Sequence, residues 1–192
     1  MSEKTSSGVL SVCDPDTFGH TAVRDVETGI ARATIPVAMP TISTKYFGEM
    51  SYDQDALFLF PFGLPAFEEE HAFLPIEMEG SRPLLFLQSI LHSHLCFIAL
   101  PVLVADPHYE LAVSRDDLET LQLNPERQPQ IGTEVLALTL ICCHEDGAPS
   151  VNLMAPLVIN LANRWAVQAV RDDFRYSHEQ ELQVPAEEVE AC

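Results

Sequence analysis

The chain has 192 residues, enough for one sizeable hydrophobic core, and its 47% hydrophobic and 20% charged residues exclude a generally disordered protein. It has 29 Asp and Glu residues against 10 Lys and Arg residues, a formal net charge of -19. Such a charge disfavours binding to nucleic acid or to an anionic membrane, because both depend on Lys and Arg contacts with phosphate. A basic protein partner fits this charge, and so does a role in solubility alone.

Both ends of the chain differ in composition from the middle. Residues 1–43 open with a polar, Ser-rich stretch, so we expect an N-terminal extension that is at most partly ordered. Within it, the run from Ala33 to Met39 is apolar enough for an edge strand, although Pro36 cannot donate a ladder hydrogen bond. Residues 177–192 hold five Glu and no Lys or Arg, which predicts a solvated acidic tail. We therefore expect a domain over residues 44–176 that folds without either end.

The cysteine pattern and the hydropathy indicate a cytoplasmic protein. The five cysteines lack the spacing of a disulfide framework, and Cys142 is adjacent to Cys143, which favours reduced thiols. The N-terminus has no signal-peptide pattern, and every apolar run is far shorter than the ~20 residues that cross a bilayer. We expect a protein that is neither exported nor embedded in a membrane.

The middle of the chain predicts a mostly β fold, because short apolar runs are separated by Pro, Gly, Asn or Asp at strand-like intervals. A small antiparallel, β-barrel-like single domain accommodates many short strands without long exposed edges. The run from Glu134 to Cys142 is apolar on both faces, so it should be a central strand with Cys142 in the core. The expected strands are Lys45–Met50, Ala56–Phe60, His71–Ile76, Leu84–Ile90, Leu95–Leu100, Tyr109–Val113, Glu134–Cys142, Val151–Met154, Leu157–Ile159 and Trp165–Val170.

One or two short helices should accompany the strands. The clearest begins after Ser114, whose side chain can cap it, with Asp116 and Asp117 in the first turn. Leu118 and Leu121 supply an apolar edge before Asn124-Pro125 ends the helix.

The sequence contains no phosphate-binding glycine loop, dinucleotide fingerprint, nucleophile elbow or zinc-protease helix, so we expect neither an enzyme nor a resident cofactor. The alternative is a small-molecule or metal-binding β-barrel. His92, His94 and Cys96 lie at period two and would point to one face of a strand, where they could bind zinc or copper. A turn at His92–His94 would prevent this, and most such clusters hold no metal. Direct RNA binding would need a basic or aromatic stripe, which the sequence lacks.

Two segments combine apolar and turn-forming residues, as interaction surfaces often do. The first is Phe60–Glu68, where three Phe and one Leu cannot all point into a small core from one tight loop. It is either a partner-binding surface or a plug that closes one end of a barrel. The second is Val151–Asn160, where Pro156 indicates an edge strand, bulge or bend and Asn152 and Asn160 can satisfy the freed backbone groups. The candidate partner-binding residues are Phe60, Phe62, Leu64, Phe67, Glu68, Asn152, Leu153 and Pro156.

The same segments carry a resemblance to a known family. Five segments resemble, in this order along the chain, the motifs of the FliW flagellar assembly factors. They are Thr44–Glu49, Phe60–Glu68, Phe86–Ser89, Asp106–Glu110 and Asn152–Asn160. The most specific match is the run Asn-Leu-x-Ala-Pro-Leu-Val-Ile-Asn at 152–160. The resemblance implies a protein that binds the translational regulator CsrA, antagonises its repression of flagellin mRNA, and has flagellin as the competing partner. Residues 1–43 have no counterpart in it.

The chain departs from the family pattern in one loop position. The family has Gly after Leu-Pro, whereas this chain has Ala66. The substitution predicts that the backbone at residue 66 needs no positive φ, the conformation that favours glycine.

Overall fold

Short β-strands make up most of the described chain, which confirms the predicted mostly β class. The computed structural model describes residues 39–144 and 147–182, so the predicted strand at Ala33–Met39 lies outside it apart from Met39. The strands are β1 (Thr41–Thr44), β2 (Gly48–Ser51), β3 (Phe58–Leu59), β4 (Ala72–Ile76), β5 (Leu85–Ser89), β6 (Cys96–Pro101), β7 (Val135–Cys142), β8 (Ser150–Val151), β9 (Leu157–Asn160), β10 (Ala166–Gln168) and β11 (Gln180–Glu181). The helices are the 3-10 turn η1 (Gln54–Ala56), α1 (Val102–Ala105) and α2 (Arg115–Thr120). No helix in the described residues is long and apolar enough to cross a membrane.

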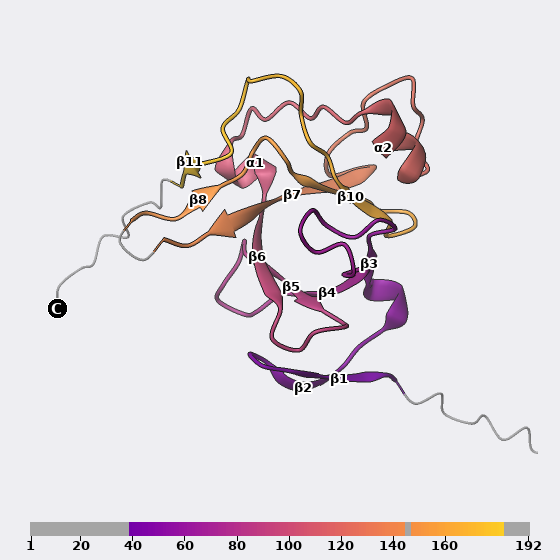
Figure 1. Cartoon of the computed structure of the whole chain (residues 1–192), viewed down its shortest axis with the longest axis vertical. Coiled ribbons are helices and arrows are strands. Elements are labelled where there is room, and N and C mark those ends of the chain that lie inside the picture. The colour runs from indigo at the N-terminus through magenta and orange to yellow at the C-terminus, as the bar shows by residue number, and fades with distance from the viewer. Residues whose placement is uncertain (1–38, 145–146, 183–192) are drawn as a thin grey trace, which may run out of the picture. The chain divides into compact units, whose positions relative to one another are not determined.

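The main sheet is antiparallel in the order β10-β9-β7-β6-β5-β4-β3, with β7 near its middle (Figure 1). β7 pairs with β6 on one side and with β9 on the other, so the predicted central position of this run is confirmed. Its far end pairs with β8 instead, and there Cys142 is exposed. The expectation of a buried Cys142 was wrong, because β7 extends past the core before it ends.

The two ends of the main sheet meet at a single point. Leu59 in β3 forms an isolated parallel bridge with Trp165, just before β10. The Leu59 N–H donates to the Arg164 carbonyl at 2.9 Å. The sheet is therefore barrel-like in its curvature, but it does not close in a continuous ladder. This seam lies beside the loop that follows β3.

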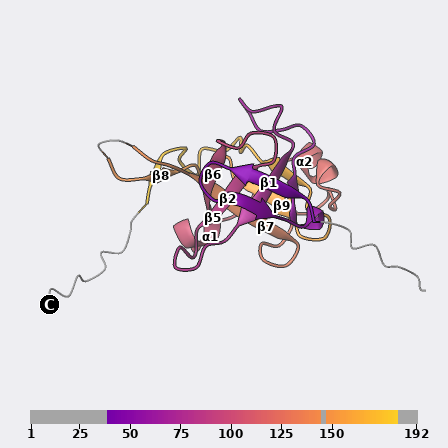
Figure 2. The same cartoon turned by 90° about the horizontal axis from the view of Figure 1, so that it is seen from below.

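The hairpin β1–β2 replaces the single strand expected over Lys45–Met50. The Thr44 hydroxyl donates to the Gly48 carbonyl and accepts from the Phe47 N–H, both at 2.9 Å, which closes a turn over residues 45–47. Phe47 then packs edge-on against Phe86 of β5, with ring centroids 5.5 Å apart. Figure 2 shows the hairpin in front of the strands of the main sheet. The expected strand was wrong over residues 45–47, because the Thr44 side chain bonds to the backbone and closes a turn there.

The helix expected after Ser114 is confirmed as α2. The Ser114 hydroxyl accepts from the Asp117 N–H, and Leu118 and Leu121 are buried below it. The strand expected at Tyr109–Val113, in contrast, was wrong. Both backbone groups of Val113 are bonded to the amide of Gln128, at 2.8 and 3.0 Å, so this segment is extended without joining a ladder.

A buried arginine ties the C-terminal part of the domain to the loop before α2. The side chain of Arg171 is 2% exposed and donates to both carboxylate oxygens of Asp173, at 2.8 and 2.7 Å. It also donates to the Glu110 carbonyl, and it lies 4.9 Å from the ring centroid of Tyr176 and 5.8 Å from that of Tyr109. The hydrogen bonds from Arg171 lower the pKa of Asp173. We call these five residues the Arg171 cluster.

The strand β11 lies within the region expected to be a solvated tail. Gln180 pairs with Val151 of β8, and the Leu182 N–H donates to the Pro149 carbonyl at 2.9 Å. At the other end, β1 begins at Thr41. The domain boundaries at residues 43 and 176 stay a prediction. Residues that pair in β-ladders nevertheless lie before residue 44 and after residue 176.

Candidate functional site

The loop between β3 and β4 combines buried anchors with exposed aromatic rings. Phe60 is 1% exposed and Leu64 is 3% exposed, and both belong to the core beneath the main sheet. Phe62 lies between them in the sequence and is 75% exposed, and Phe67 is 39% exposed. The two interpretations of this loop, a plug and a partner-binding surface, thus apply to different residues. Phe60 and Leu64 fill the core, while Phe62 faces solvent.

Hydrogen bonds hold the exposed part of this loop in one conformation. The Phe67 N–H donates to the Leu64 carbonyl at 2.7 Å, and the Leu64 N–H donates to the Phe67 carbonyl at 3.1 Å. The Gly63 N–H donates to the Phe60 carbonyl at 3.1 Å. A Cβ at Gly63 would lie 2.4 Å from the Glu68 carbonyl oxygen, so only glycine fits there. Phe62 is therefore presented by a loop that is already ordered.

Residue 66 needs the left-handed conformation that its alanine side chain disfavours. Ala66 has a φ of 69°, at the third position of a four-residue turn with Pro65 second, which is typical of a type II turn. The prediction that this position needs no positive φ was wrong. The Ala66 N–H also donates to the Glu68 carboxylate at 3.1 Å, which stabilises the turn.

We predict that Ala66→Gly stabilises the protein. A left-handed alanine costs about 1–2 kcal/mol, and the extra freedom of glycine in the unfolded chain cancels about 0.4–1 kcal/mol of that. The expected net gain is about 1 kcal/mol, measured as a higher midpoint in urea. An unchanged or lower midpoint would contradict the strain. The control Ala162→Gly changes an exposed alanine outside the positive-φ positions and should not stabilise.

A buried carboxylate fixes the far end of the loop. Glu70 is 3% exposed, and its carboxylate accepts from the Ser89 hydroxyl at 2.5 Å and contacts the Nδ1 of His92. The Ser89 hydroxyl in turn accepts from the His92 N–H at 2.8 Å. Glu70 is thus buried, whereas its neighbours Glu68 and Glu69 are exposed.

The geometry does not bring His92, His94 and Cys96 together as a metal site. His92 contacts Glu70, and the rings of His92 and His94 lie 5.7 Å apart in a turn. The Cys96 thiol donates to the Phe97 carbonyl at 3.8 Å, and burial raises its pKa. Across residues 39–144 and 147–182, no group of three His, Cys, Asp or Glu side chains is arranged to hold a metal ion.

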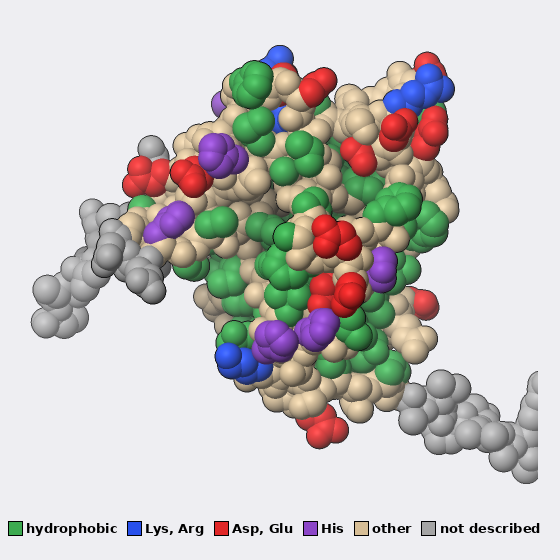
Figure 3. Space-filling model, viewed as in Figure 1, with side chains coloured by type: hydrophobic (Ala, Val, Ile, Leu, Met, Phe, Trp, Pro, Cys, Tyr) green, Lys and Arg blue, Asp and Glu red, His purple; other side chains and the backbone are tan. Residues whose placement is uncertain are grey.

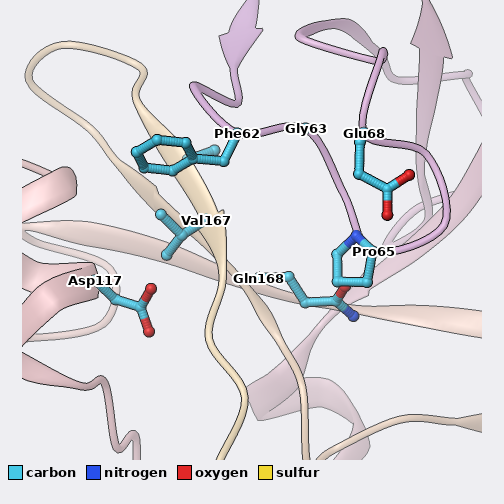
Figure 4. Close-up of a pocket in the computed structure, with 8 residues that line it drawn as sticks. Phe62, Gly63, Pro65, Glu68, Asp117, Val167 and Gln168 are labelled. Atoms are coloured by element: carbon cyan, nitrogen blue, oxygen red, sulfur yellow. The ribbon is translucent and has the colours of Figure 1, made fainter.

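A cleft of about 340 Å³ lies between the loop and strand β10 (Figure 4). In this view Phe62 lies above Val167, and the Gln168 amide lies beneath Pro65. The carboxylates of Glu68 and Asp117 stand on opposite sides of the cleft. Its lining residues are Phe62, Gly63, Pro65, Glu68, Asp117, Ala166, Val167 and Gln168, which include two carboxylates and no Lys or Arg. We call it the β10 cleft.

A second cleft, of about 390 Å³, lies on the other side of the same loop. Its lining residues are Ala66, Phe67, Glu68, Glu69, Glu70, His92, His94 and Leu95. Figure 3 shows acidic side chains among hydrophobic ones on one face of the molecule, with histidines close by. Glu68 lines both clefts, so the loop forms a ridge between two acidic, partly apolar hollows.

The second predicted segment, Val151–Asn160, is mainly structural. Leu153 is 2% exposed and Pro156 is buried, so neither side chain is available to a partner. The side-chain Oδ1 of Asn152 accepts from the N–H groups of residues 154 and 155, each at 3.1 Å. Asn160 donates to the Leu121 carbonyl at 2.8 Å. The predicted role in satisfying backbone groups of the bend is confirmed for Asn152. It was wrong for Asn160, which bonds the end of α2 and the Ala162 N–H instead.

Sequence reasoning missed the wall of the β10 cleft opposite the loop. Asp117 was expected to act only in helix capping, and Val167 and Gln168 only as part of a strand. No spacing links these residues to Phe62, because the seam between β3 and β10 joins distant segments. The only signal in the sequence was the loop itself, which places Phe residues beside a Gly and two Pro.

Comparisons with known proteins identify the family of this chain. The family model described as FliW protein matches residues 41–182. The flagellar assembly factor FliW of Syntrophomonas wolfei is 29% identical over 140 residues, 72% of this chain and 85% of that protein. That of Bacillus velezensis is 32% identical over 136 residues, 70% of this chain and 91% of that protein. A crystal structure of the flagellar assembly factor FliW covers 74% of this chain and 96% of its own, with a TM-score of 0.65 and 26% identity. The chain belongs to the FliW family.

Proposed function

We propose that this protein is a cytoplasmic flagellar assembly factor that binds CsrA and thereby relieves its repression of flagellin mRNA translation. Flagellin is the competing partner. The protein acts by binding alone, without catalysis, cofactor or direct contact with nucleic acid. Membership of the FliW family supports the flagellar role, because its curated relatives are named flagellar assembly factors.

The observation that carries the binding role is the exposed ring of Phe62 on an ordered loop. Large aromatic side chains that are presented without conformational cost are typical anchors of protein interfaces. Phe62 is 75% exposed, although Phe60 before it is buried and the Gly63 N–H after it is hydrogen-bonded. The clefts on both sides offer apolar surface with acidic rims, which suits a partner that carries apolar and basic side chains together.

The experiment that tests this proposal is a competition between the two partners. We expect the protein to bind purified CsrA, and flagellin to release CsrA in a titration. If both partners prefer the same state or surface, each lowers the affinity of the other by the same factor, because linkage is reciprocal. Isothermal titration with each partner, alone and in the presence of the other, measures both factors. A stable ternary complex with unchanged affinities would contradict the exchange mechanism. Binding of neither partner would contradict the whole proposal.

We predict that Phe62→Ala weakens binding to at least one partner by about tenfold or more, as loss of an aromatic anchor does. The melting temperature should stay close to that of the wild type, because the ring is largely exposed. Leu64→Ala or Leu153→Ala would also reduce binding, but each truncates the core and costs about 2–5 kcal/mol of stability, so they cannot locate an interface.

Phe174→Ala is the matched control, since Phe174 is 93% exposed but does not line either cleft. It should leave both affinities within about twofold, as exposed residues outside a hot spot do. Equal losses in the two variants would mean that surface apolarity in general, rather than this loop, drives association.

A further inference from the structure

The β10 cleft has the chemistry of a socket for one long basic side chain. Its walls are apolar where Phe62 and Val167 face each other, and its rims carry the carboxylates of Glu68 and Asp117 (Figure 4). A Lys or Arg side chain has the same two parts, an apolar stem and a cationic head. A neutral apolar side chain would match the walls but not the rims.

The carboxylates of this cleft are not neutralised within the described chain. Neither Glu68 nor Asp117 forms an ion pair among residues 39–144 and 147–182, whereas Glu77, Glu119, Glu134 and Asp173 each pair with an arginine there. Glu68 accepts only the Ala66 N–H, and Asp117 accepts from the Ser114 hydroxyl at 2.7 Å. Each of these bonds orients its carboxylate without cancelling its charge.

We propose that the β10 cleft receives a Lys or Arg side chain of CsrA, with the stem against Phe62 and Val167 and the cation between Glu68 and Asp117. This assignment rests on the proposed function and names the contact that gives it specificity. Within that function, the large negative charge of the protein steers the basic partner over long range, and the β10 cleft fixes the docking register. Loss of the cleft charges should therefore speed dissociation more than it slows association.

Two pairs of isosteric substitutions separate the cleft from the overall charge. The test variant is Glu68→Gln with Asp117→Asn, which retains acceptor oxygens for the Ala66 N–H and the Ser114 hydroxyl. The control is Glu49→Gln with Asp116→Asn, which removes the same number of charges at two exposed residues that line neither cleft. Both variants have the same formal charge, so long-range steering is equal in both. CsrA binding is measured by surface plasmon resonance with the full-length chain.

We expect the test variant to lose about tenfold or more in affinity, mainly through faster dissociation, and the control to change less than about twofold. Equal losses in both would show a uniform field without a socket, and an unchanged test variant would show that the cleft is empty in the complex. A wild-type dimer that the test variant disrupts would assign the cleft to a second copy of the chain. Each of these results overturns the inference while wild-type binding to CsrA keeps the proposed function. Absence of wild-type binding overturns both.

The comparison stays decisive even if Asp117→Asn weakens the cap of α2. Melting curves of all variants show whether the helix is affected. In that case the single substitutions Glu68→Gln and Glu49→Gln carry the test, because neither residue belongs to the helix. A larger loss for Glu68→Gln supports the socket, and equal affinities contradict it.

Discussion

Replacing Arg171 by Ala should lower the free energy of unfolding by about 3 kcal/mol, because it removes a buried side chain with its packing and leaves the Glu110 carbonyl without its donor. The substitution removes the hydrogen bonds to Asp173 and Glu110 and the packing against Tyr176. These contacts join the C-terminal segment to the loop before α2. Urea denaturation of the full-length chain measures the loss.

The matched control is Arg175→Ala, four residues away. Arg175 also pairs with Glu110 and Asp173, but its side chain is 55% exposed, and exposed pairs contribute about 0–1 kcal/mol. Similar losses in the two variants would contradict the role of burial. Because Arg171 lowers the pKa of Asp173, its contribution is present above the unfolded pKa of about 3.9 and is lost as the pH falls through the folded pKa. The difference between the variants should therefore shrink in acid.

Trimming the chain to residues 39–182 should preserve a cooperative melt, whereas a fragment of residues 44–176 should be clearly less stable. The shorter fragment loses Thr41–Ser43 of β1 and the pairing of β11 with β8. It also loses Ile42, which packs in the cluster beneath the hairpin. The loss of about 2 kcal/mol or more follows from that apolar burial and the broken ladder, and it should lower Tm by about 4–8 °C.

Circular dichroism melts of the two fragments and the full chain make this comparison. A fragment of residues 44–176 that melts at the temperature of the longer one would support the boundaries predicted from composition. If the 39–182 fragment is itself molten, residues before 39 or after 182 contribute to the core.

The parts of the fold that depend on neighbours in sequence could be predicted, and the parts that depend on distant side chains could not. The cap of α2 follows from Ser114 and Asp117 within one turn, and the central place of β7 follows from its two apolar faces. The extended segment ending at Val113 resembles a strand in composition, but Gln128 occupies its backbone groups. The local sequence does not indicate that Gln128, rather than a neighbouring strand, bonds the backbone of Val113.

The candidate site shows the same limit. The loop Phe60–Glu68 was predicted as a special segment, but the sequence did not separate the anchors Phe60 and Leu64 from the exposed Phe62. That separation depends on which side chains the sheet beneath can accept. The opposite wall of the β10 cleft depends on the seam between β3 and β10, which no periodicity reveals.

The β10 cleft also depends on the seam between β3 and β10. One wall of the cleft follows β3 and the other is β10, and the bond from the Leu59 N–H to the Arg164 carbonyl joins the two. Opening at this bond is a small local unfolding event that leaves the rest of the ladder intact. A ligand that binds only the form with this bond closed draws the equilibrium toward closure. Occupancy of the cleft and solvent protection of the Leu59 amide are thus two readouts of one equilibrium.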